Sequence, residues 1–134
     1  MNRRHQVVVV GAGFGGLYAV HELVGSDLDV TIIDRRNFHL FQPLLYQVAT
    51  GTISAPDISA PIRSIFGDKK NITVRLDAAT GIDPQNKYIE TASHTKIPYD
   101  DIIVATGASP VSYTHLRAHE TEADLVCRLL LEKK

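Results

Sequence analysis

The chain has 134 residues, the size of a single domain, and its 14 lysines and arginines nearly balance its 15 aspartates and glutamates. This balance provides no basic field for nucleic acid, so partners of that class are not expected. No apolar run approaches the length that crosses a membrane.

The N-terminal part predicts a strand, a glycine turn, a helix and a second strand. Residues 6–10 read QVVVV and are apolar on both faces, as a central parallel strand must be. They lead into the glycine turn, GAGFGG at residues 11–16, and apolar residues continue at helical spacing over 14–24. A second apolar strand, residues 29–34, ends in Asp34. This order is typical of a βαβ unit that binds a dinucleotide.

Each part of this unit has a role in holding a dinucleotide. Gly11 allows the tight turn, Gly13 lets the backbone approach the pyrophosphate, and Gly16 lets the helix pack closely on the strand. The pyrophosphate would lie on amides at the helix N-terminus, where the macrodipole favours negative charge. Asp34 is expected to accept hydrogen bonds from ribose hydroxyls. Because Asp34 would repel a 2′-phosphate, we expect the arginines at 35 and 36 to be solvated or to contact the adenine edge.

The rest of the chain predicts further α/β structure. The long apolar and aromatic loop at 35–54 is expected to cover the cofactor. A short helix is predicted over 56–66, ending at Gly67, because its isoleucines and Phe66 share one helical face. The later predicted elements are a strand at 72–76, a turn at 83–86 within a small antiparallel insert that includes 88–91, and a parallel strand from Tyr99 to Gly107.

The C-terminal segment, residues 111–134, resembles the translation of a sequencing-library adapter in one reading frame. We therefore expect a non-native tail, with residues 1–110 as the genuine domain sequence. The alternative is a real amphipathic helix, since Leu125, Arg128, Leu129 and Glu132 have helical spacing. The one cysteine, Cys127, lies in this tail, so the rest of the chain has no thiol for disulfide chemistry at a flavin.

Two segments resemble known flavoproteins. The sequence IIVATGA, at 102–108, resembles the second conserved FAD contact of reductases with two dinucleotide-binding domains. The sequence HLFQPLLYQVATG, at 39–51, is similar to type II NADH:quinone oxidoreductases, and the resemblance runs from Val7 to about Ser109. It implies the incomplete FAD-binding Rossmann domain of an enzyme that passes electrons from NADH through FAD to a quinone. The pyrophosphate would be surrounded by Gly11, Ala12, Gly13, Phe14, Gly15 and Gly16; the adenosine would lie by Asp34 and Arg35, and the flavin by Pro43, Leu44, Ala105, Thr106 and Gly107.

In that family, the second glycine fingerprint for NADH, the quinone segment and the C-terminal membrane-associated helices would all follow Ser109. We therefore expect this chain to bind FAD weakly and not to oxidise NADH, and the full-length enzyme to lie on the cytoplasmic face of the membrane. The resemblance assigns no catalytic acid or base, and no histidine has metal-binding spacing. The alternatives are another FAD/NAD(P) reductase, of ferredoxin reductase or sulfide:quinone type, a plain NAD-binding dehydrogenase, and a non-catalytic dinucleotide-binding module. Cysteines would be needed for the sulfide:quinone type, and the insert followed by VATGA argues against the plain dehydrogenase.

Overall fold

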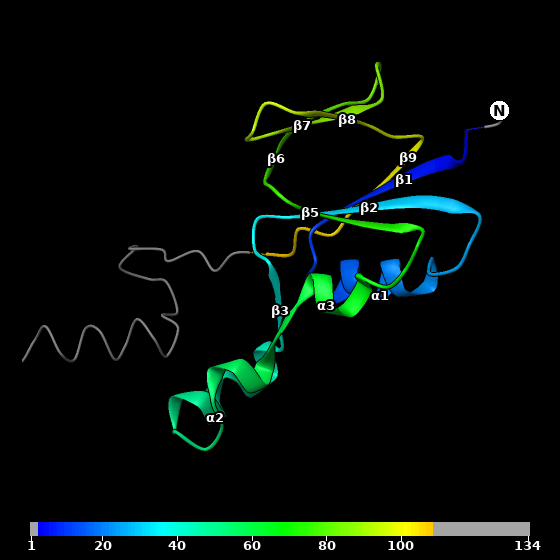
Figure 1. The fold of residues 1–134 in the computed structure, drawn as a ribbon. Helices are drawn as coiled ribbons and strands as arrows, with labels where there is room; N and C mark the ends of the chain where they lie inside the picture. Colours follow the sequence, from blue (N-terminus) through cyan, green and yellow to red (C-terminus); the bar gives the residue numbers. More distant parts are fainter. Residues whose placement is uncertain (1–2, 109–134) are drawn as a thin grey trace, which may run out of the picture.

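A parallel sheet of four strands forms the middle layer of the molecule, in the order β5, β2, β1, β9 (Figure 1). The computed structural model describes residues 3–108, and the predicted tail at 111–134 lies outside them. Val9, in the centre of the sheet, lies opposite Ile32 of β2 and Ile103 of β9. The predicted parallel strands are therefore confirmed, although the last of them stops at Val104. Their bounds are His5–Val10 for β1, Leu28–Asp34 for β2, Ile72–Leu76 for β5 and Asp101–Val104 for β9.

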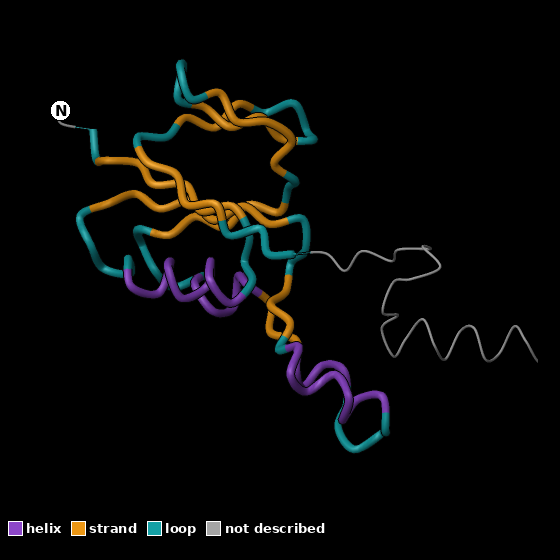
Figure 2. The backbone as a smooth tube through the Cα atoms, turned by 180° about the vertical axis from the view of Figure 1, so that it is seen from behind, coloured by secondary structure: helices purple, strands orange, loops and turns teal. Residues whose placement is uncertain are grey.

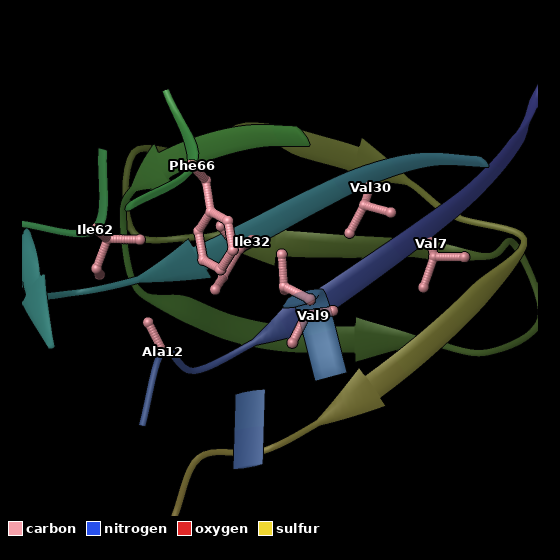
Figure 3. Close-up of a cluster of buried hydrophobic side chains, with 8 residues drawn as sticks. Val7, Val9, Ala12, Val30, Ile32, Ile62 and Phe66 are labelled. Carbon is pink, nitrogen blue, oxygen red and sulfur yellow. The ribbon is translucent and has the colours of Figure 1, made fainter. Parts of the chain in front are cut away.

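Helices cover one face of this sheet. They are α1, Phe14–Glu22, and α3, Ile62–Phe66, and both lie below the sheet in Figure 1. Alternate strand residues such as Val7 and Val9 point to this face, because successive side chains of a strand face opposite sides. Figure 3 shows the resulting core. Its buried members are Val7, Val9, Ala12, Val20, Val30, Ile32, Ile62 and Phe66.

A small antiparallel sheet covers the opposite face. It consists of β6 (Ala79–Asp83), β7 (Tyr88–Thr91) and β8 (Lys96–Pro98), and it confirms the predicted insert. A second apolar core lies between the two sheets, formed by the other alternate residues of β1 and β2 together with residues of the antiparallel sheet and Tyr99. Its buried members are Val8, Val10, Ile33, Ile89, Ile97 and Tyr99. The parallel sheet is thus buried on both faces, which explains its continuous apolar runs.

The predicted covering loop is an arm that projects from these layers (Figure 2). Its base is an antiparallel pair in which His39 lies opposite Ala60. Beyond the base, Pro43 lies in the first turn of a short 3₁₀ helix, where its missing amide hydrogen is tolerated. The elements of the arm are β3 (Phe38–Leu40), η1 (Gln42–Leu44), α2 (Leu45–Ala49), η2 (Ala55–Ile58) and β4 (Ser59–Pro61).

The predicted helix over 56–66 is wrong in its first half. That half forms η2 and β4, and only Ile62–Phe66 is α-helical. The reason is Pro61, which cannot donate within a helix and which restricts the preceding Ala60 to extended conformations. A smaller difference concerns α1, which ends at Glu22 instead of residue 24.

Candidate dinucleotide-binding site

The carboxyl ends of β1 and β9 meet at a point where the chain changes direction across the sheet. From β1 the chain passes through α1 to β2 on one side, and it returns later to β9 on the other side of β1. In open α/β sheets, ligands bind beyond the carboxyl ends of the strands at such a switch point. The glycine turn follows β1 at this point, and Ala105 to Gly107 follow β9.

Two glycines of the turn are required by close backbone approaches. Gly11 has a φ of +100°, and a Cβ there would lie 2.4 Å from the carbonyl oxygen of Ala105. A Cβ at Gly16 would lie 1.7 Å from the carbonyl oxygen of Gly11. Since neither position has room for a side chain, glycine lets β1, α1 and the end of β9 come together.

Gly13 differs because it faces open space. A Cβ there would meet no atom within 4 Å. Gly13 is also the N-cap of α1, and no side chain caps the first turn of the helix. The amides at this helix end therefore face a space where an anionic group could accept their hydrogen bonds.

Asp34 braces the glycine turn from the end of β2. Its Oδ2 accepts a hydrogen bond from the amide of Ala12 at 2.6 Å, and its Oδ1 accepts one from the amide of Arg36 at 2.7 Å. A carboxylate has about four acceptor positions, so these two bonds leave capacity for ribose hydroxyls. Asp34 is therefore a support of the turn as well as the predicted ribose partner.

Two adjoining hollows, of about 340 and 460 Å³, lie along this edge of the sheet. They share Gly11, Asp34, Arg35, Thr106 and Gly107. The larger hollow brings together most of the predicted residues. Its lining consists of Gly11, Ala12, Gly13, Phe14, Gly15, Asp34, Arg35, Arg36, Phe38, Leu40, Gln42, Ala105, Thr106, Gly107 and Ala108.

The family model described as pyridine nucleotide-disulphide oxidoreductase matches residues 5–128. The chain belongs to this family. It is 48% identical over 109 residues to the type II NADH:quinone oxidoreductase Ndh of Mycobacterium tuberculosis, a match that covers 79% of this chain and 24% of that protein. The pyridine nucleotide-disulphide oxidoreductases bind FAD, and the chain is similar to the type II NADH:quinone oxidoreductases among them, as the resemblance implied.

Solved structures agree with this placement in the pyridine nucleotide-disulphide oxidoreductase family. The Plasmodium falciparum NDH2 structure in complex with NADH has a TM-score of 0.75 at 26% identity, covering 84% of this chain and 24% of that chain. The sulfide:quinone oxidoreductase of Aquifex aeolicus has a TM-score of 0.72 at 34% identity, covering 80% of this chain and 25% of that chain. The chain spans about a quarter of the length of these relatives.

Three predicted residues of this family member lie outside the hollows. Gly16 is buried beneath the turn, while Pro43 and Leu44 lie on η1 of the arm. The position of Pro43 and Leu44 beside the isoalloxazine ring stays a prediction. The adjacent Gln42 does line the larger hollow.

Several residues that line the hollows were not predicted as site residues. From the base of the arm, the larger hollow gains Phe38 and Leu40. The smaller hollow gains Asp77, Ala78 and Ala79, which follow β5. Asp77 could have been found, because polar residues just after a parallel strand lie at the ligand-binding edge of the sheet.

Asp77 is held as a carboxylate by the antiparallel sheet. The hydroxyl of Ser93, in the turn between β7 and β8, donates to Oδ2 of Asp77, and the amide of Ala78 donates to Oδ1. Hydrogen bonding, first from Ser93 and then from Thr91, lowers the pKa of Asp77 to about 2. Asp77 is thus ionised at neutral pH.

The described residues of the hollows offer backbone amides and the Asp34 carboxylate as binding groups. Within residues 3–108, no group of three or more His, Cys, Asp or Glu side chains could hold a metal ion. Over the same range, no helix has the length and apolar character to cross a membrane.

Proposed function

We propose that this chain is the FAD-binding part of an oxidoreductase that passes electrons from NADH through FAD to a quinone. The observation that carries the proposal is the open space at Gly13, opposite Ala105 to Gly107, at the switch point of the sheet. Membership of an FAD-binding family supports FAD as the dinucleotide, and the 48% identity to a type II NADH:quinone oxidoreductase supports the reaction class.

Different residues of the two hollows would bind different parts of FAD. The amides at the start of α1 would bind the pyrophosphate, and Gly13 leaves room for it. Asp34 would accept a ribose hydroxyl while it holds Ala12. Thr106 and Gly107 would line the flavin end, where the backbone can come close.

Once bound, FAD would accept electrons from NADH and release them to the quinone. The residues described here bind and orient it, and the sites for NADH and quinone are proposed for the rest of the enzyme, at the cytoplasmic face of the membrane. The 134-residue chain alone is proposed to be inactive in turnover.

The product of the complete native gene tests this proposal. It is expected to show the visible absorption bands of bound FAD, to lose them on addition of NADH under anaerobic conditions, and to regain them with a soluble quinone. A purified protein without flavin bands would overturn the proposal. A flavin that NADH reduces and quinone does not reoxidise would favour the general FAD/NAD(P) reductase.

A sulfide-oxidising enzyme is the second candidate, because the Aquifex aeolicus sulfide:quinone oxidoreductase shares this fold at 34% identity. That chemistry needs cysteine thiols, and residues 3–108 contain none. If NADH is the electron donor of the complete enzyme, NADH should bleach the flavin and sulfide should not. Bleaching by sulfide alone would reverse the choice.

A further inference from the structure

The glycine turn needs restraint from outside itself. Ala12 lies between Gly11 and Gly13, and glycine has the least conformational preference of any residue. A turn that presents amides to an anion binds best when their directions are fixed before the ligand arrives.

Two side chains hold Ala12, one on each side. Asp34 accepts the hydrogen bond of its amide at 2.6 Å, and Nδ1 of His39 lies 3.0 Å from its carbonyl oxygen. Ala12 is itself 3% exposed, so solvent competes little for these bonds. His39 belongs to β3, at the base of the arm.

The chemistry of this contact fixes the proton on His39. A carbonyl oxygen can only accept, so Nδ1 carries the hydrogen and donates it to Ala12. The ring has little freedom to turn away. It packs edge-on against Phe14 with ring centroids 5.1 Å apart, and Phe14 packs against Phe41 in the same manner at 5.6 Å.

The carbonyl of Ala12 and the amide of Gly13 belong to one peptide unit. Because a trans peptide is planar, its N–H points opposite to its C=O. A donor that holds the carbonyl therefore also sets the direction of the Gly13 amide, which points away from His39. A hydrogen bond to the carbonyl further polarises the unit and strengthens its amide as a donor.

We propose that His39 is a positioning residue for FAD, which holds the Ala12–Gly13 peptide so that the Gly13 amide faces the pyrophosphate. This inference rests on the proposed function, since it names how the same site is oriented. It also gives the arm a role, because the arm contributes the donor that fixes the glycine turn.

Three variants of the complete gene product separate the donor from the ring. His39→Asn keeps an N–H donor near the position of Nδ1, His39→Leu has a similar size without a donor, and His39→Phe keeps the ring without a donor. FAD is removed from each protein, and its affinity is measured on reconstitution by quenching of flavin fluorescence. We expect the Leu and Phe variants to bind about tenfold more weakly than wild type, and the Asn variant to bind within about threefold of it.

A control and a second measurement distinguish positioning from general stability. His21→Leu, at an exposed position of α1, should leave FAD affinity unchanged. Thermal unfolding of each apoprotein shows whether affinity merely follows stability. The inference would be overturned if all three His39 variants bound FAD as tightly as wild type. It would also be overturned if His39→Asn bound FAD as weakly as His39→Leu and the FAD affinities of the variants followed their thermal stabilities. A wild-type protein that bound no FAD would overturn the proposed function as well.

Discussion

A side chain would meet opposite conditions at two glycines of the same turn. At Gly13 a Cβ would enter open space, whereas at Gly16 it would lie 1.7 Å from the carbonyl oxygen of Gly11. Gly13 therefore borders open space, where we propose that the pyrophosphate lies, and Gly16 lets α1 pack on the strand. Substitution of Gly13 should therefore affect FAD binding, and substitution of Gly16 should affect the stability of the fold.

We expect Gly13→Val to abolish FAD binding by the complete gene product and to leave its fold intact. The backbone at Gly13 suits valine, with φ −71° and ψ −166°, so the loss of stability should stay below about 1 kcal/mol. Gly16→Ala should instead lower the free energy of unfolding by about 3 kcal/mol or more. Chemical denaturation and flavin titration measure the two effects.

Gly15→Ala is the matched control for stability, because its Cβ would make an ordinary contact 3.9 Å from the Cβ of Ala105. It should unfold at the same denaturant concentration as wild type or at a slightly higher one. Unchanged FAD affinity in Gly13→Val would contradict the assignment of the turn as a pyrophosphate cradle.

Asp77 gives a prediction on pH at the same scale. Its pKa is lowered from 3.8 to about 2, so the folded state favours the carboxylate. The stability that this contributes is fully present above about pH 4 and is lost as pH falls through about 2. Ser93→Ala should raise the pKa of Asp77 toward its ordinary value, because the first cause of the shift is removed. Carboxyl ¹³C titration by NMR measures this, and Ser64→Ala, whose hydroxyl bonds to Pro61, is the control.

At the scale of elements, Asn71 joins the turn after α1 to the start of β5. Its side-chain amide donates to the carbonyl of Leu23 at 2.9 Å and accepts from the amide of Gly25 at 3.1 Å. Asn71 is 8% exposed, so a group left without its partner there is also shielded from water. This side chain closes the connection between α1 and β2.

Asn71→Ala should therefore destabilise the complete protein by about 2 kcal/mol, because backbone groups of the turn lose their partners. Denaturant unfolding measures the change. Asn86→Ala, at an exposed turn where the side chain bonds to Asp83, should stay within about 0.5 kcal/mol of wild type. If both variants lowered the free energy of unfolding by the same amount, the hydrogen bonds of Asn71 would contribute no particular stability.

The elements show which parts of the fold a sequence can predict. The central strands were predictable, because a strand buried on both faces is apolar throughout, as residues 7–10 are. The helix expected over 56–66 is wrong in its first half, because Pro61 interrupts a segment whose apolar residues otherwise have helical spacing.

The missed parts of the site have a different cause. The bond between His39 and Ala12 joins residues 27 apart in the sequence, and Ser93 reaches Asp77 across 16. No local pattern encodes such pairs, because they depend on where β3 and the β7–β8 turn pack. The glycine turn and Asp34 were predictable since their spacing is set within one βαβ unit.

At the scale of the whole molecule, the two outer layers depend on the parallel sheet between them. Within residues 3–108, β5 and β9 pair on one side only and form the two edges of that sheet. Leu76 on β5 is 52% exposed and Val104 on β9 is 58% exposed. Apolar edge strands of this kind favour association between chains.

The residues from 111 onward give a prediction at this scale. We expect long-read sequencing of the native locus to show that the native gene encodes a different sequence after about residue 110. The family match runs on to residue 128. A native gene that encodes VSYTHLRAHETEADLVCRLLLEKK in frame would contradict the expectation.

The 134-residue chain and the complete gene product should differ in turnover more than in FAD recognition. The proposed cradle holds one dinucleotide, while the match to the Mycobacterium tuberculosis relative covers 24% of that protein. Electron transfer needs NADH and quinone held against the flavin, so the shorter chain should bind FAD weakly and leave NADH unoxidised. NADH consumption with a soluble quinone, measured at equal protein concentration with added FAD, checks this. Gly13→Val in the complete protein is the control for activity without bound FAD, and NADH oxidation by the 134-residue chain above that control would place the donor site within these residues.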